Sequence, residues 1–207
     1  MEASSPMLSN VLMNKIINPM EIEDKQNLKA RKFLVWLFII SSFMIFAGLT
    51  SGYIVYTAGS PDRGLKTLLP DAFKYSTVII VISSITMYMA HLSGKRLQFN
   101  KQKMFLIATI LLGLVFMAVQ YYAWQVLIGQ GVYFVNYNAS QSFIYVFTGF
   151  HMFHILAGIF MLVNSLTGVM KNIPQVRNLF RLEVTSIFWH FIDILWIYLY
   201  VFLLLNQ

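Results

Sequence analysis

The stretch from Ser142 to Val169, SFIYVFTGFHMFHILAGIFMLVNSLTGV, contains no aspartate, glutamate, lysine or arginine. A helix needs about 20 predominantly apolar residues to cross the hydrocarbon core of a membrane, and this run is long enough. Four further apolar runs satisfy the same criterion, at about residues 33–56, 73–91, 104–128 and 184–205. The pattern predicts an all-α, polytopic membrane protein whose fold is a bundle of five transmembrane helices.

The composition also indicates a membrane protein. Of the 207 residues, 58% are hydrophobic and 11% are charged, with a mean hydropathy of +0.66, whereas a soluble domain carries about 25% charged residues. The chain has no cysteine, which excludes disulfides and cysteine-ligated zinc or iron–sulfur clusters. The net charge of +7 does not predict a nucleic-acid partner, because the basic residues stand in short clusters between the apolar runs.

These basic clusters predict the orientation of the chain, since cytoplasmic loops carry an excess of lysine and arginine. They lie before the first span, between the second and third, and between the fourth and fifth, at Lys25, Lys29, Arg31, Lys32, Lys95, Arg96, Lys101, Lys103, Lys171, Arg177 and Arg181. We therefore expect the N-terminus inside and the C-terminus outside. Residues 1–32 are expected to form a cytoplasmic tail and residues 33–207 the transmembrane domain.

A few ionisable side chains lie within or beside the last two spans: His151 and His154 in the fourth, His190 and Asp193 in the fifth, and Glu183 just before it. A spacing of three residues places each pair on one helix face. With a rise of about 1.5 Å per residue, the depths of His154 and Asp193 differ by only about 5 Å. The spacing predicts a buried polar cluster between these two spans.

Three interpretations of this cluster remain open from the residues alone. The histidines and the aspartate could bind a metal ion, or paired histidines could ligate haem, although the spans hold almost no acid for a carboxylate-bridged site. The same groups could relay protons, although they are too few for a route across the bilayer. We favour the third interpretation, a hydrogen-bonded contact between helices, because an unpaired polar group in lipid costs several kcal/mol.

The segments TGFHMFHILAGIF and IFWHFIDILWIYLYVFLL together resemble the last two spans of subunit III of the haem-copper terminal oxidases. That family reads T-G-F-H-G-x-H-x-x-x-G in the first and W-H-F-x-D-x-x-W in the second. The matching residues are Thr148, Gly149, Phe150, His151, His154 and Gly158, and then Trp189, His190, Phe191, Asp193 and Trp196. The resemblance extends over about residues 33–205, and the five-span form is similar to bacterial members.

The chain departs from the family pattern at three positions. Ser42 stands where many members carry a glutamate in the first core span, and Ala123 stands where many carry one after Gln120. Met152 replaces the glycine between the two histidines of the fourth span. Any role tied to the missing acids is therefore not expected here.

The resemblance implies a non-catalytic subunit of a proton-pumping oxidase that reduces oxygen to water in the bacterial inner membrane. It implies no catalytic, cofactor or metal site in this chain, with haem and copper in the partner subunits I and II, and bound phospholipid. Assistance to proton or oxygen access, and membership of a larger respiratory supercomplex, are further expectations. Lys171, Arg177 and Arg181 could contact anionic lipid head groups, or they could be a topology signal alone.

The resemblance leaves two questions of function open. Subunit III occurs with both cytochrome c oxidases and quinol oxidases, and we expect the cytochrome c type. The second hypothesis for the chain is a small ion or proton transporter that uses the histidine and aspartate cluster.

Overall fold

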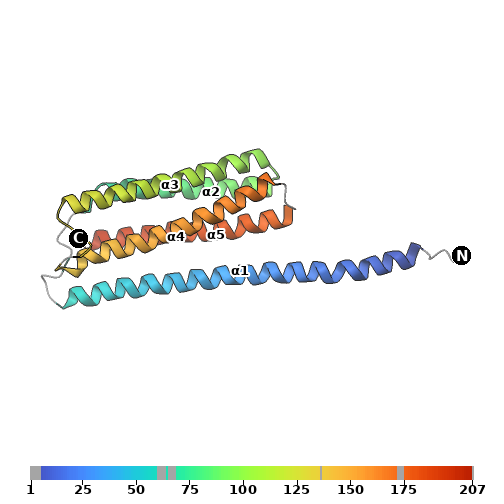
Figure 1. The fold of residues 1–207 in the computed structure, drawn as a ribbon, viewed down its shortest axis with the longest axis horizontal. Coiled ribbons are helices and arrows are strands. Elements are labelled where there is room, and N and C mark those ends of the chain that lie inside the picture. The colour runs from blue at the N-terminus through green and yellow to red at the C-terminus, as the bar shows by residue number, and fades with distance from the viewer. Residues whose placement is uncertain (1–5, 60–63, 65–68, 136, 172–174, 207) are drawn as a thin grey trace. The chain divides into compact units, whose positions relative to one another are not determined.

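The structure is a computed structural model that describes residues 6–59, 64, 69–135, 137–171 and 175–206. Its helices are α1 (Pro6–Ala58), α2 (Ala72–Lys95), α3 (Phe99–Gly129), α4 (Ala139–Met170) and α5 (Gln175–Leu205) (Figure 1). All five contain a segment long and apolar enough to cross a membrane, and the described ranges contain no strand. The prediction of an all-α protein with five transmembrane helices is confirmed.

The helices extend beyond the apolar runs from which they were predicted. The largest difference is in α1, which begins at Pro6, whereas the apolar run from which it was predicted begins at about residue 33. Helix formation depends on backbone hydrogen bonds and on residue propensity, and glutamate, lysine and glutamine favour it as well as leucine does. The polar segment from Pro6 to Lys32 therefore belongs to the same helix as the first span.

The chain divides into two compact units, Met1–Ile40 and Ser41–Gln207, of which the second contains the bundle. Within the bundle, α2 packs against α3 and α5, and α4 packs against α3 and α5 (Figure 1). The part of α1 that belongs to this unit contacts both α4 and α5. The Thr50 hydroxyl lies 2.9 Å from the Tyr198 hydroxyl, and the Tyr53 ring packs edge-on against Phe143 and Phe202.

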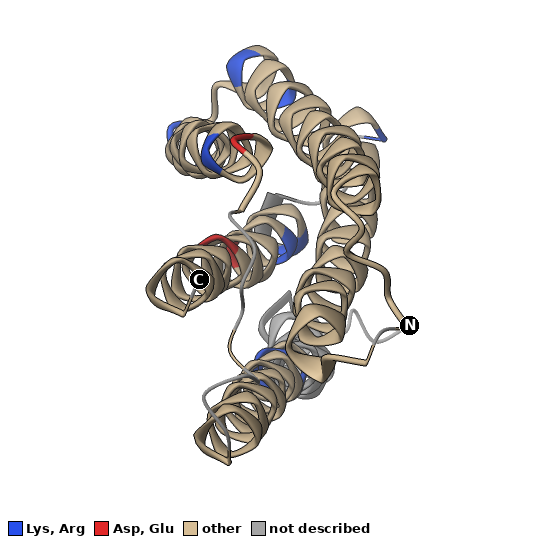
Figure 2. Cartoon of the chain, turned by 90° about the vertical axis from the view of Figure 1, so that its left-hand side faces the viewer, with Lys and Arg blue, Asp and Glu red and all other residues tan. Residues whose placement is uncertain are grey.

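The charged residues occupy only short stretches of the ribbon (Figure 2). Each of the spanning segments contains a window with at most two acidic or basic residues. The large apolar side chains that face outward include Ile85 on α2, Leu111 on α3 and Phe160 on α4. Such a surface is stable when it faces lipid or another membrane protein, so the chain is a multi-pass membrane protein.

The centre of the bundle is occupied by the Trp189 side chain of α5, which is completely buried. Its indole N–H donates to the Ser83 hydroxyl of α2 at 3.1 Å. Gly113 of α3 and Gly158 of α4 lie against the ring, because a Cβ atom at either glycine would stand 2.9 Å from a ring carbon. One tryptophan thus brings four helices together, and two of them need a glycine at the point of contact.

Candidate functional site

The intramembrane histidines of α4 have different surroundings. His154 Nδ1–H donates to the Phe150 carbonyl oxygen at 2.7 Å, which determines its tautomer because a carbonyl oxygen only accepts. In the neutral ring, Nε2 is then the acceptor, and it lies 3.1 Å from the hydroxyl of Ser42 on α1. His154 therefore links α4 to α1 through a serine at one of the positions where the sequence departs from the family pattern.

His151 lies in an aromatic environment. Its side chain is completely buried, and its ring lies 5.7 Å from the Phe116 ring of α3 and 5.0 Å from the Trp196 ring of α5. Neither ring nitrogen has a hydrogen-bond partner among the described residues. The structure thus surrounds this histidine with rings, where the sequence predicted polar neighbours.

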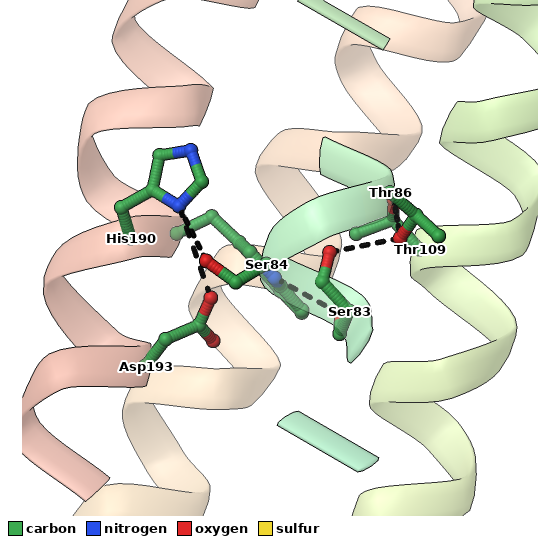
Figure 3. A network of polar contacts seen from close by, with 7 residues as sticks. Ser83, Ser84, Thr86, Thr109, His190 and Asp193 are labelled. Carbon is green, nitrogen blue, oxygen red and sulfur yellow. Dashed lines mark hydrogen bonds and ion pairs between the residues drawn. The ribbon is translucent and has the colours of Figure 1, made fainter. Parts of the chain in front are cut away.

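His190 and Asp193 lie together on the side of α5 that packs against α2 (Figure 3). His190 Nδ1 is 2.7 Å from the Ser84 hydroxyl oxygen of α2 and 4.0 Å from a carboxylate oxygen of Asp193. The Asp193 side chain is only 5% exposed, whereas that of His190 is 32% exposed. The pair and the serine form a polar contact between α5 and α2 within the membrane.

The predicted polar residues thus lie at several helix contacts. The structure brings His190 and Asp193 together, and it gives His154 a partner on α1. Glu183 is partly buried and stands two helical turns before His190 on α5. That these residues act as one cluster stays a prediction. Of the basic residues considered for lipid contact, Lys171 and Arg177 are exposed and Arg181 is partly exposed.

Within the described residues, hydroxyl side chains make several polar contacts between the helices, and the sequence did not predict these pairs. The Thr86 and Thr109 hydroxyls join α2 to α3 at 2.9 Å (Figure 3), and those of Ser165 and Thr185 join α4 to α5 at 3.0 Å. The indole N–H of Trp196 donates to Thr77 at 3.1 Å. Serine and threonine are common in transmembrane helices of every kind. The residues that join two helices are therefore recognised only by their pairing in the structure.

The polar side chains within the bundle form hydrogen bonds between helices. Among the residues that the structure describes, no three histidine, aspartate or glutamate side chains lie close enough together to hold a metal ion. A cavity of about 760 Å³ lies away from the histidines, at the end of the bundle where α2 begins, and its lining includes Lys74, Tyr122 and Tyr200. Within the described residues, His154 contacts Ser42 of α1 and His190 contacts Ser84 of α2.

Comparison with known proteins gives matches over most of the chain. The sequence model of the family described as "Cytochrome c oxidase subunit III" matches residues 21–206. The chain is 29% identical over 176 residues to cytochrome c oxidase subunit 3 of Bacillus sp. (strain PS3), with 82% of this chain and 83% of the relative covered. It is 30% identical over 181 residues to cytochrome c oxidase subunit 3 of Synechocystis sp., with 83% of this chain and 73% of the relative covered. It is also 29% identical over 168 residues to cytochrome bo(3) ubiquinol oxidase subunit 3 of Pseudomonas aeruginosa, with 80% of this chain and 79% of the relative covered.

Proposed function

Since the chain belongs to the cytochrome c oxidase subunit III family, we propose that it is the non-catalytic subunit III of a proton-pumping haem-copper oxidase. The observation that supports this most strongly is the extent of the family match, which runs from residue 21 to residue 206 and includes the whole of α2, α3, α4 and α5. The oxidase reduces oxygen to water in the plasma membrane of a bacterium. This chain contributes to its stability and supplies no redox centre.

A structural role agrees with the surroundings of the polar groups. His154 is held in one tautomer between a carbonyl oxygen and Ser42, and His190 contacts Ser84. Contacts of this type between transmembrane helices contribute about 0.6 kcal/mol each on average. Their main effect is to orient the helices, because each polar group would cost several kcal/mol if it faced lipid alone.

The partners of the chain are the catalytic subunit I and subunit II, which hold the haem and copper, within the oxidase or a larger respiratory assembly. Cytochrome c is the electron donor that we favour, and a quinol is the alternative, since relatives of both types are found. Family membership does not favour a separate ion transporter. Phospholipid binds at the basic segment that contains Lys171, Arg177 and Arg181, through attraction to anionic head groups.

Purification of the tagged chain in a mild detergent tests this function. We expect the wild-type chain to bring haem-bearing subunits with it, which are detected by their visible absorbance and by identification of the accompanying chains. A chain that purifies alone or as a homo-oligomer, and that moves ions in liposomes, would contradict the proposal.

The Asp193→Asn variant measures the contribution of the α2–α5 polar contact to assembly. Replacement of one carboxyl oxygen by an amide beside His190 loosens this contact, so we expect about three-fold less haem per purified chain, which corresponds to one average interhelical polar contact of about 0.6 kcal/mol. The turnover of each assembled complex is expected to change little. Asp71→Asn is the matched control, because Asp71 is exposed at the start of α2, where its carboxylate pairs with Lys74. Unchanged assembly with abolished proton pumping in Asp193→Asn would indicate a relay instead.

A further inference from the structure

The His190 imidazole is only partly covered by its own chain. Its Nδ1 contacts Ser84 and faces Asp193, whereas its second ring nitrogen, Nε2, points away from both (Figure 3). The side chain is 32% exposed, and none of the hydrogen bonds found among the described residues reaches Nε2. One polar atom of this ring therefore faces the surroundings of the bundle.

The depth of His190 makes this exposure costly. The apolar run of α5 extends from about residue 184 to residue 205. His190 lies about 9 Å along the helix axis from residue 184 and about 22 Å from residue 205, at a rise of about 1.5 Å per residue. This position lies inside a hydrocarbon core about 30 Å thick. Lipid acyl chains offer no hydrogen bond there, so an uncovered imidazole nitrogen is strongly disfavoured.

The neighbours of His190 form a surface that suits another transmembrane helix. The His190 face consists of Val81, Ser84 and Tyr88 on α2 and of Ile187, His190 and Ile194 on α5. Within each helix these residues are spaced by three, four or seven positions, so they follow one side of the helix. The Ser84–His190 contact places the two rows side by side. The result is a largely apolar face within the hydrocarbon core, whose polar side chains are His190, Ser84 and the exposed Tyr88.

We propose, on the premise that the proposed function holds, that the His190 face binds a transmembrane helix of the catalytic oxidase subunit. That helix presents a hydrogen-bonding side chain, such as a hydroxyl, amide or carboxyl group, to His190 Nε2. A lipid head group does not reach this depth, and water in the hydrocarbon core needs polar walls that the flanking isoleucines do not provide. Asp193 and Ser84 act as positioning residues that direct the ring toward the partner.

Site-directed crosslinking in the intact complex tests which face is covered. The chain has no cysteine, so a single Ile194→Cys substitution can carry a thiol-reactive benzophenone without background labelling. Ile194 is 67% exposed and lies one turn from His190. Leu114→Cys is the control on α3, where Leu114 is 48% exposed. The neighbouring Gly113 contacts Trp189, which directly precedes His190, so Leu114 lies at nearly the same depth as His190.

Irradiation in native membranes is expected to join the Ile194→Cys chain to the catalytic subunit and the Leu114→Cys chain to lipid or to nothing. Crosslinks to the catalytic subunit from Leu114→Cys but not from Ile194→Cys would overturn the proposal and leave the proposed function intact. Crosslinks from Ile194→Cys to a second copy of this chain, or to lipid alone, would also overturn it. If the wild-type preparation contained no haem-bearing partners, both the proposed function and this proposal would be contradicted.

Three substitutions then test the polar atom itself. His190→Phe removes both ring nitrogens, His190→Gln retains a hydrogen-bonding group, and Ser84→Ala removes only the internal contact. We expect His190→Phe to retain roughly five- to fifteen-fold less catalytic subunit during detergent purification, and His190→Gln and Ser84→Ala, like Asp193→Asn, to lose about three-fold or less. Equal losses in His190→Phe and Ser84→Ala would show that the internal contact is what matters, and would overturn the proposal. The thermal unfolding of each purified chain separates loss of folding from loss of binding.

Discussion

At the scale of single residues, the structure depends on close contacts around Trp189. The ring is bound to Ser83 through its N–H and is bordered by Gly113 and Gly158. Interiors of proteins are close-packed, so a methyl group added at such a contact forces side chains or backbone to shift. The family motif places a glycine at residue 158, and the contact with Trp189 supplies a physical reason for it.

The Gly158→Ala substitution is expected to destabilise the purified chain by about 1–3 kcal/mol, the usual cost of overpacking a core. The added Cβ would stand 2.9 Å from two ring carbons of Trp189. Gly149→Ala is the control on the same helix, since a Cβ there meets no atom within 4 Å, and alanine favours a helix over glycine by about 1 kcal/mol. Thermal unfolding in detergent compares the two, and an equal loss of stability in both would contradict this account of Trp189.

At the scale of secondary structure, α2 and α3 form a tight antiparallel hairpin. The Leu97 N–H donates to the Gly94 carbonyl oxygen at 3.2 Å, and the Gln98 N–H donates to the Ser93 carbonyl oxygen at 3.0 Å. This pair of bonds is a Schellman motif, which ends a helix with one residue in the left-handed conformation. Leu97 occupies that position with a φ of 59°, where glycine is the usual residue.

Replacement of Leu97 therefore separates backbone strain from side-chain contacts. A residue other than glycine in the left-handed region costs about 1–2 kcal/mol, and the Leu97 side chain is mostly exposed. We expect Leu97→Gly to be more stable than Leu97→Ala by about 1 kcal/mol, because both lose the side chain and only glycine relieves the strain. Thermal melting of the two variants measures this difference, and a more stable alanine variant would show that the hairpin is not strained at Leu97.

At the scale of the whole molecule, the basic residues predict how the bundle is oriented in the membrane. Lys95, Arg96, Lys101 and Lys103 gather around the α2–α3 hairpin, and the α3–α4 connection around Tyr137 has no charge in its described part. Positively charged segments stay on the cytoplasmic side during insertion. We therefore predict that the hairpin faces the cytoplasm and that the α3–α4 connection faces the opposite side.

Thiol labelling of intact cells tests this orientation on the cysteine-free chain. A membrane-impermeant reagent is expected to label Tyr137→Cys in intact cells and Asn100→Cys only after permeabilisation. Both positions are exposed in the structure, so a difference in labelling reports the side of the membrane. The reverse pattern would place the N-terminus outside and would show that the loop charges do not govern insertion here.

The number of spans, their approximate limits and the family motifs could all be read from the amino-acid order. Hydropathy is a property of a local run, and a run such as residues 142–169 crosses a membrane whatever its neighbours are. The spacing that places His190 and Asp193 on one helix face is also a local property of the sequence, independent of the neighbouring helices.

The contacts between helices were decided by the tertiary structure. Hydropathy does not record which side of one helix meets which side of another, so the partnership of His154 with Ser42 and of His190 with Ser84 could not be derived from spacing and depth. His151 was expected among polar groups and lies between Phe116 and Trp196, because the rotation of α4 about its axis is determined by packing against all its neighbours at once. That rotation, and the exposure of His190 Nε2, exist only in the assembled bundle.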